Sequence, residues 1–140
     1  MILVDTGPLV ALCDARDPYH RRAVEDLKSF TAATFATCDA VTVETCFHLP
    51  HEMQRRRLRG LLEKLGVSFV TDTVEPACRE EVFDWLLKYA EHQPDWADGC
   101  VAVLSGRYPG ASVWTYDRDF GTTWRRPDGG AIPLATGADT

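Results

Sequence analysis

Two short apolar runs that each end at an aspartate constrain the fold of this chain more than any other feature. Ile2-Leu3-Val4 ends at Asp5, and Ser112-Val113-Trp114-Thr115-Tyr116 ends at Asp117. Ile2-Leu3-Val4 is continuously apolar, as is typical of a buried strand in a parallel sheet, and the second run is read as a further strand. In an open parallel sheet, ligands bind outside the carboxyl ends of the strands. We therefore expect both aspartates to face one crevice.

Strand-like and helix-like patterns alternate along the rest of the chain. Further strands are expected at 33–37 and 67–70, with a short last strand at 131–134. Apolar residues at helical spacing predict helices over the segments 6–13, 19–30, 39–49, 54–65, 73–92 and 96–107. This alternation predicts a three-layer α/β/α fold in which helices flank a central parallel sheet.

Length and composition are those of a single globular domain spanning residues 1–140, with a frayed polar tail at about 135–140. No apolar run reaches membrane-spanning length, and the N-terminal residues do not resemble a targeting segment. A cytoplasmic location is therefore expected. The five cysteines are odd in number and widely spaced, which argues against a disulfide framework and against a zinc ribbon.

The net charge of -6 is unusual for a protein that binds nucleic acid generally. A basic run, Arg55-Arg56-Arg57-Leu58-Arg59, interrupts the acidic background. Two interpretations of this run stay open. It is either the solvated face of an amphipathic helix or a surface that holds RNA phosphates through Arg55, Arg56 and Arg59.

Two further acids, Glu44 and Asp98, lie within or at the start of expected helices. Each acid taken alone has an ordinary explanation as a helix cap, a dipole partner or a solvated group. Several carboxylates at one end of a sheet repel one another, and a divalent cation relieves that repulsion. Mg²⁺ or Mn²⁺ suits oxygen ligands better than zinc does. His48 and His51 have no third ligand beside them, so no zinc site is predicted.

The order of these acids resembles the four motifs of PIN-domain nucleases, and the resemblance covers nearly the whole chain. It is closest to the VapC-like toxins of toxin–antitoxin pairs. The motifs are Ile2-Leu3-Val4-Asp5-Thr6, Val43-Glu44-Thr45, Asp95-Trp96-Ala97-Asp98-Gly99 and Trp114-Thr115-Tyr116-Asp117-Arg118-Asp119-Phe120.

The resemblance implies a PIN-like fold and a Mg²⁺-dependent endoribonuclease, for which Mn²⁺ substitutes. It implies catalytic and metal-binding roles for Asp5, Glu44, Asp98 and Asp117. Asp119 is a competing or additional metal ligand, since the family uses acids at either place. Supporting roles around the metal fall to Thr6, Asp95 and Thr115. The family also implies a homodimer, a cognate antitoxin and an RNA substrate.

Two other functions fit the sequence less well. A PIN fold that binds RNA or protein without cutting is disfavoured because the acid set is intact. A phosphatase would normally carry an Asp-x-Asp motif after the first strand, where this chain has Asp5-Thr6-Gly7. Among the tryptophans, Trp85, Trp96 and Trp114 are expected in the core, and Trp124, beside two arginines, is the better candidate for stacking on a base.

Overall fold

The computed structural model describes residues 1–136, and its elements follow the expected alternation of strands and helices. The elements in chain order are β1 (Ile2–Val4), α1 (Thr6–Cys13), α2 (His20–Ser29), β2 (Phe35–Thr37), α3 (Asp39–His48), α4 (Glu52–Lys64), β3 (Ser68–Phe69), the 3-10 turn η1 (Asp72–Val74), α5 (Pro76–Lys88), the 3-10 turn η2 (Ala90–His92), α6 (Trp96–Arg107), β4 (Ser112–Trp114) and α7 (Asp119–Thr122). Only the short helix α7 has no counterpart among the expected elements.

All four strands run parallel in the order β3-β2-β1-β4, so β1 lies inside the sheet. Ile2 to Val4 pair in register with Ser112 to Trp114, and the Asp5 amide continues the ladder by donating to the Trp114 carbonyl at 3.0 Å. The first and the last motif of the chain therefore lie side by side, at the end of the sheet where both strands stop.

The expected last strand is reduced to a single parallel bridge between Val113 and Leu134. Ala135 donates from its amide to the Val113 carbonyl at 2.8 Å, so the chain is still attached to the sheet where fraying was expected to begin. The rest of the expected tail, from 137 onward, lies outside the described residues.

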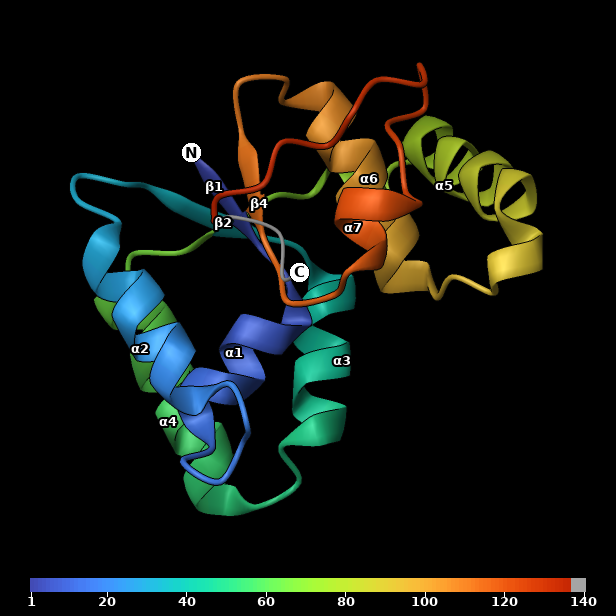
Figure 1. The fold of residues 1–140 in the computed structure, drawn as a ribbon. Coiled ribbons are helices and arrows are strands. Elements are labelled where there is room, and N and C mark those ends of the chain that lie inside the picture. Colours follow the sequence, from blue (N-terminus) through green and yellow to red (C-terminus); the bar gives the residue numbers. More distant parts are fainter. Residues whose placement is uncertain (137–140) are drawn as a thin grey trace.

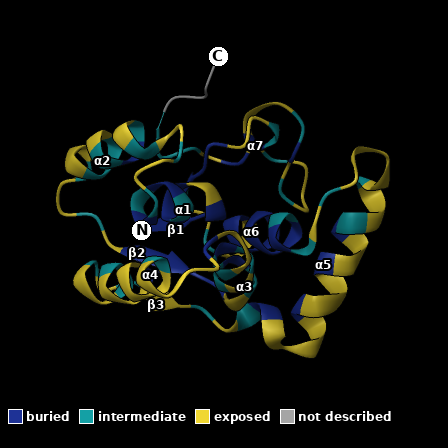
Figure 2. Ribbon diagram, turned by 90° about the horizontal axis from the view of Figure 1, so that it is seen from below, coloured by how far each residue is buried: buried dark blue, intermediate teal, exposed yellow. Residues whose placement is uncertain are grey.

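Helices cover both faces of the sheet and confirm the three-layer prediction (Figure 1). Helices α1, α2 and α4 group together on one side, and α5, α6 and α7 on the other, while α3 contacts both α1 and α6. Buried residues concentrate in β1, β2, β4, α1 and α6, whereas β3 and the outer faces of α4 and α5 are exposed (Figure 2). Helix α3 is thus placed between the two groups, at the carboxyl end of the sheet.

Trp124 is buried, and its expected role as an exposed stacking residue is wrong. Only 3% of its surface is exposed, and its ring packs against Trp85 and Tyr89 at centroid distances of 5.2 and 5.5 Å. The Trp85 indole N–H donates to the Arg125 carbonyl at 2.7 Å, which ties the segment after α7 to α5. Trp85 and Trp114 lie in the core as expected, whereas Trp96 is only half-buried.

All five cysteines are free thiols, and four of them are buried. Within residues 1–136, no helix combines the length and the apolar character needed to cross a membrane.

Two glycines give a paired test of how closely α6 packs. A Cβ on Gly99 would lie 3.0 Å from Val82 and 3.3 Å from both Leu86 and Trp85, whereas a Cβ on Gly60 would meet nothing within 4 Å. Gly60→Ala should raise the free energy of unfolding by about 1 kcal/mol through helix propensity. Gly99→Ala should lower it by about 1 kcal/mol or more because overpacking exceeds that gain. Urea denaturation measures both free energies. Equal stabilisation by the two variants would contradict the prediction, because it would mean that the side chains of α5 shift to accommodate a methyl group at position 99.

Candidate metal centre

The two strand-end aspartates are linked through one threonine. The Thr115 hydroxyl donates to Asp5 Oδ2 at 2.7 Å and accepts the Asp117 amide N–H at 3.0 Å. Asp5 is 6% exposed, although it is a carboxylate. Since β1 and β4 are neighbours in register, the sheet itself brings these residues together. Thr115 therefore contacts both strand-end aspartates, and its supporting role around a metal stays a prediction.

A second pair of acids opens helix α6. Asp95 Oδ1 accepts the Asp98 amide N–H at 2.8 Å, and Asp98 Oδ2 accepts the Asp95 amide N–H at 3.1 Å. This reciprocal capping satisfies two amides that a helix start leaves without partners. It also fixes both carboxylates at the same end of α6. Glu44 approaches this end from α3, which packs against α6.

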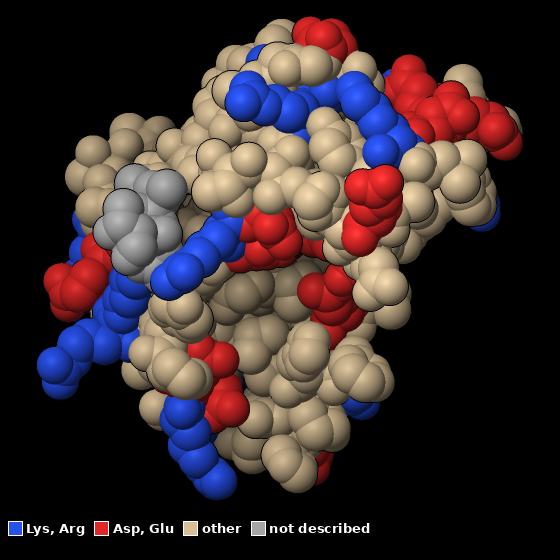
Figure 3. All heavy atoms as spheres, turned by 45° about the vertical axis from the view of Figure 1, so that its right-hand side comes forward, with Lys and Arg blue, Asp and Glu red and all other residues tan. Residues whose placement is uncertain are grey.

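These acids line one hollow, here called the acidic cleft, with a volume of about 370 Å³. Its lining brings together most of the predicted site residues, namely Asp5, Thr6, Glu44, Asp95, Asp98 and Asp117. Acidic side chains gather around a hollow on the face shown in Figure 3, with basic side chains at its rim. The sequence-based grouping of acids from four separate motifs therefore corresponds to one place in the fold.

Asp117 and Asp119, left open as alternatives by the sequence, have different surroundings. Asp117 lines the acidic cleft, and Asp119 does not. The Asp119 amide donates to Asp117 Oδ1 at 2.9 Å, while its carboxylate accepts the Thr123 hydroxyl at 3.1 Å within the turn of α7. The geometry therefore favours Asp117 over Asp119 as a ligand in the cleft. The backbone amide of Asp119 holds the Asp117 carboxylate in place.

Burial and the charges of neighbouring acids raise the pKa values of Asp5, Asp98 and Asp117 in this cleft. Desolvation raises the pKa of Asp98 to about 8, and the negative charges of Asp95, Asp5 and Asp117 contribute to the rise. Desolvation likewise raises the pKa of Asp5 to about 6, although the Thr115 hydroxyl opposes the shift. The pKa of Asp117 is also raised, chiefly by burial. A cation in the cleft would replace the protons that these groups retain.

Glu44 faces Asp95 across the cleft, and its pKa rises to about 7 through desolvation and through this neighbour. The Thr6 hydroxyl acts in the opposite direction and lowers the pKa of Glu44. That hydroxyl is buried and has no hydrogen-bond partner of good geometry among the described residues. It is therefore a polar group still available to a ligand.

The donor atoms suit a hard divalent cation, because most of them are carboxylate or hydroxyl oxygens. Among the described residues, no lysine or arginine lines the cleft to offset the carboxylate charges. In residues 1–136, no three acidic, histidine or cysteine side chains already converge closely enough to hold a metal. The carboxylates would thus have to draw together around an ion. The chemistry of the donor atoms is compatible with a divalent cation, and the ligand roles of Asp5 and Asp98 stay predictions.

The three arginines predicted to bind RNA lie away from the acidic cleft and have other contacts. Arg55 donates to the carbonyls of Leu49 and Cys46 at 2.8 and 3.1 Å, at the C-terminal end of α3. Arg56 pairs with Glu52 at 2.8 Å, and Arg59 pairs with Glu63 at 3.7 Å. They line a separate hollow that shares no residue with the acidic cleft. Their contact with RNA stays a prediction.

Several residues of the cleft wall were not predicted from the sequence. Tyr19 and Tyr116 stack with ring centroids 4.9 Å apart and form one side of the cleft. The Tyr116 hydroxyl donates to Asp26 Oδ2 at 2.7 Å, which fixes this ring. His48 also lines the cleft. Tyr116 lies within the fourth motif, but its place in the cleft wall, like those of Tyr19 and His48, depends on how α2 and α3 pack around the sheet end.

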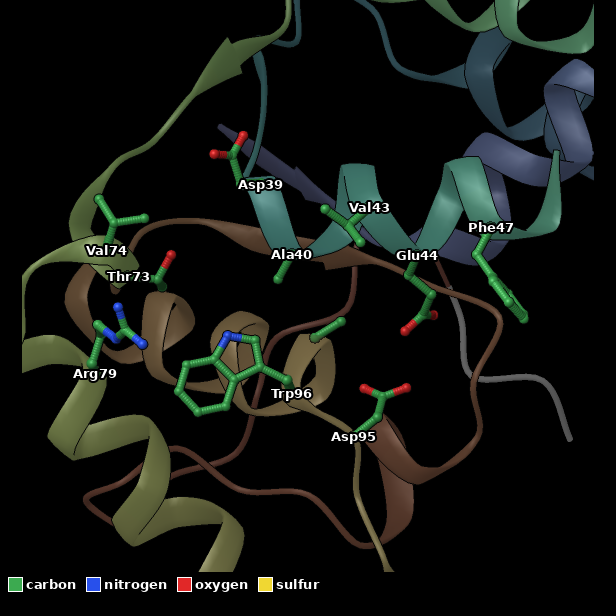
Figure 4. Close-up of a pocket in the computed structure, with 11 residues that line it drawn as sticks. Asp39, Ala40, Val43, Glu44, Phe47, Thr73, Val74, Arg79, Asp95 and Trp96 are labelled. Carbon is green, nitrogen blue, oxygen red and sulfur yellow. The ribbon is translucent and has the colours of Figure 1, made fainter. Parts of the chain in front are cut away.

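A larger hollow of about 550 Å³ opens on the other side of Glu44 and Asp95, whose carboxyl groups face each other at its edge (Figure 4). Its walls are mostly apolar and come from α3, η1, the start of α5 and the start of α6. Val43, Phe47 and Val74 are 71%, 79% and 57% exposed around it. This apolar hollow is therefore continuous with the acidic cleft and largely uncovered.

Comparison with known families supports the assignment that this geometry suggests. The PIN domain family model matches residues 2–123. The chain belongs to the PIN-domain family. Among solved structures, this PIN domain is similar to Mycobacterium tuberculosis VapC20, described as a Sarcin-Ricin loop cleaving toxin. The two share 21% sequence identity with a TM-score of 0.72, over 91% of this chain and 98% of that one. No curated protein matches the sequence significantly.

The raised pKa values predict how stability depends on pH when metal is absent. Aspartates in an unfolded chain have a pKa of about 4. In the folded PIN domain, burial raises the pKa of Asp5 to about 6 and that of Asp98 to about 8. Between these values the folded state binds more protons than the unfolded state, so stability falls as the pH rises. In EDTA, Tm should therefore decrease from about pH 5 to about pH 8.

Asp98→Asn provides the control, because its amide does not ionise. The fall in Tm should be smaller in this variant than in the parent, and Mg²⁺ should reduce the fall in the parent by replacing the protons. Parallel pH profiles for the two proteins in EDTA would contradict the assigned burial of Asp98.

Proposed function

We propose that this protein is a metal-dependent endoribonuclease that hydrolyses RNA phosphodiester bonds as the toxin of a toxin–antitoxin pair. The acidic cleft carries the proposal, because a partly buried set of carboxylates with raised pKa values is suited to a divalent ion and to phosphate chemistry. Membership of the PIN-domain family and the likeness to VapC20 support it further.

The roles of the residues follow from their positions. Asp5 and Asp98 would hold Mg²⁺, or Mn²⁺ in its place, with Asp117 at the strand end beside them. Such an ion polarises a scissile phosphate and favours ionisation of water at neutral pH. Glu44 either orients the attacking water and accepts its proton at a carboxylate oxygen, or holds a second ion together with Asp117. Thr115 and Asp95 keep the carboxylates in place through the hydrogen bonds already described.

Neutralising one carboxylate should abolish cleavage without unfolding the protein. Asp98→Asn keeps the size of the side chain but removes a metal-binding charge, so the RNA cleavage rate should fall at least about a thousandfold. Gel analysis of labelled tRNA, rRNA fragments and synthetic single strands, in Mg²⁺, Mn²⁺ or EDTA, measures this. Asp119→Asn is the matched control and should lose much less activity. Cleavage by Asp98→Asn at the parent rate would refute the site assignment.

We also propose two protein partners. A second copy of the chain covers the apolar hollow, since Val43, Phe47 and Val74 form an exposed apolar patch of the kind that marks interfaces. A cognate antitoxin covers the acidic cleft and excludes RNA from it. The hollow and the cleft share Glu44 and Asp95, so dimer formation would enclose one side of the site.

A charge placed in the apolar patch tests the dimer. Phe47→Asp should convert a dimer to a monomer, because desolvating an unpaired carboxylate costs several kcal/mol. Light scattering after gel filtration gives the mass of each species. Thr31→Asp, at an exposed position between α2 and β2, adds the same charge elsewhere and should stay dimeric. A parent protein that remains monomeric at all concentrations would contradict the proposal.

A further inference from the structure

A fourth hollow, here called the basic trough, continues from the acidic cleft at His48. It has a volume of about 670 Å³ and lies between the loop after α1 and the start of α4. Arg16, Arg57, His48 and His51 line it, and His48 lines the acidic cleft as well. Its size is within the range of roughly 300–1,000 Å³ that is typical of ligand sites. The two hollows thus form one path across the surface.

Among the described residues, the two arginines of the basic trough have no anionic partner, in contrast to Arg56 and Arg59 of α4. Neither the Arg16 nor the Arg57 guanidinium makes an ion pair or a hydrogen bond within the described part of the chain. Asp14 is the only acid in the lining, and its Oδ1 accepts the Arg16 backbone N–H at 3.0 Å. By contrast, Arg56 and Arg59 on the same helix are paired with glutamates.

An RNA strand that enters the acidic cleft requires positively charged groups beside it. Six carboxyl groups line it, and the whole chain has a net charge of -6, so an RNA backbone is repelled wherever no cation compensates. A metal ion held by the acids would offset negative charge only near the scissile phosphate. Phosphates farther along the strand require fixed cations within reach, and unpaired guanidinium groups are well suited to bind them.

We propose that the basic trough holds the phosphates of single-stranded RNA on one side of the cleavage point, with Arg16 and Arg57 as phosphate-binding residues. This inference rests on the proposed nuclease function and adds the direction in which the substrate strand leaves the cleft. It assigns the RNA contact of α4 to Arg57 rather than to the glutamate-paired arginines of the same helix. These contacts give affinity without base specificity, since phosphate carries no sequence information.

Binding is measured by fluorescence anisotropy with a labelled single-stranded 12-mer RNA, in the Asp98→Asn protein so that no cleavage intervenes. Arg16→Ala and Arg57→Ala should each weaken binding about fivefold or more and lower the slope of log affinity against log salt by about 0.7. Arg59→Ala removes the same charge from the same helix and decides between the two predictions. The inference requires a change in affinity of less than about twofold, whereas phosphate binding by Arg59 itself requires a loss like that of Arg57→Ala.

Two further readings separate this inference from the nuclease proposal. In the otherwise unchanged protein, Arg57→Ala should raise KM for the 12-mer with little change in kcat, and should not affect RNAs too short to reach the trough. Trough-dependent binding without cleavage would support the inference and overturn the nuclease. Cleavage with equal RNA affinity in the Arg16, Arg57 and Arg59 variants would overturn the inference and leave the nuclease standing. Loss of affinity only for an acidic antitoxin segment would overturn it as well.

Discussion

Repulsion among carboxylates at the carboxyl end of a parallel sheet is the constraint on which this structure depends. Asp5 and Asp117 meet because β1 and β4 pair in register, and the capped start of α6 adds Asp98. Burial then raises the pKa of Asp98 to about 8, so the folded chain retains protons that carboxylates normally lose. Unfavourable burial of carboxyl groups is thus concentrated in the acidic cleft. The Thr115 hydroxyl holds Asp5 there, and the reciprocal caps of α6 hold Asp95 and Asp98.

The sequence predicted most of the architecture, since strands and helices were marked by their apolar periodicity. Helix α6 was expected at the residues where it is found, and the acids of four motifs were expected in one crevice. That Asp117 rather than Asp119 lines the cleft was not predictable, because it depends on the turn into α7. Trp124 was misassigned because its burial depends on packing against Trp85 and Tyr89, which lie far from it in the sequence.

The arginines of α4 illustrate a different limit. Periodicity predicts that Leu58 faces the core and that the arginines face outward, and both are observed. Successive residues of a helix point about 100° apart, so arginines that are adjacent in sequence face different surroundings. Arg55 contacts the end of α3, Arg59 pairs with a glutamate, and Arg57 faces the basic trough. Only the docked position of α4 decides which of them is available to a ligand.

Calorimetric titration with Mn²⁺ near pH 7, repeated in buffers of different ionisation enthalpy, tests the central claim most directly. If the cleft carboxylates retain protons that a cation replaces, Mn²⁺ should bind with measurable proton release. Asp98→Asn should bind more weakly and release fewer protons. Absence of Mn²⁺ binding, or binding without proton release that is equal in the parent and Asp98→Asn, would contradict the account.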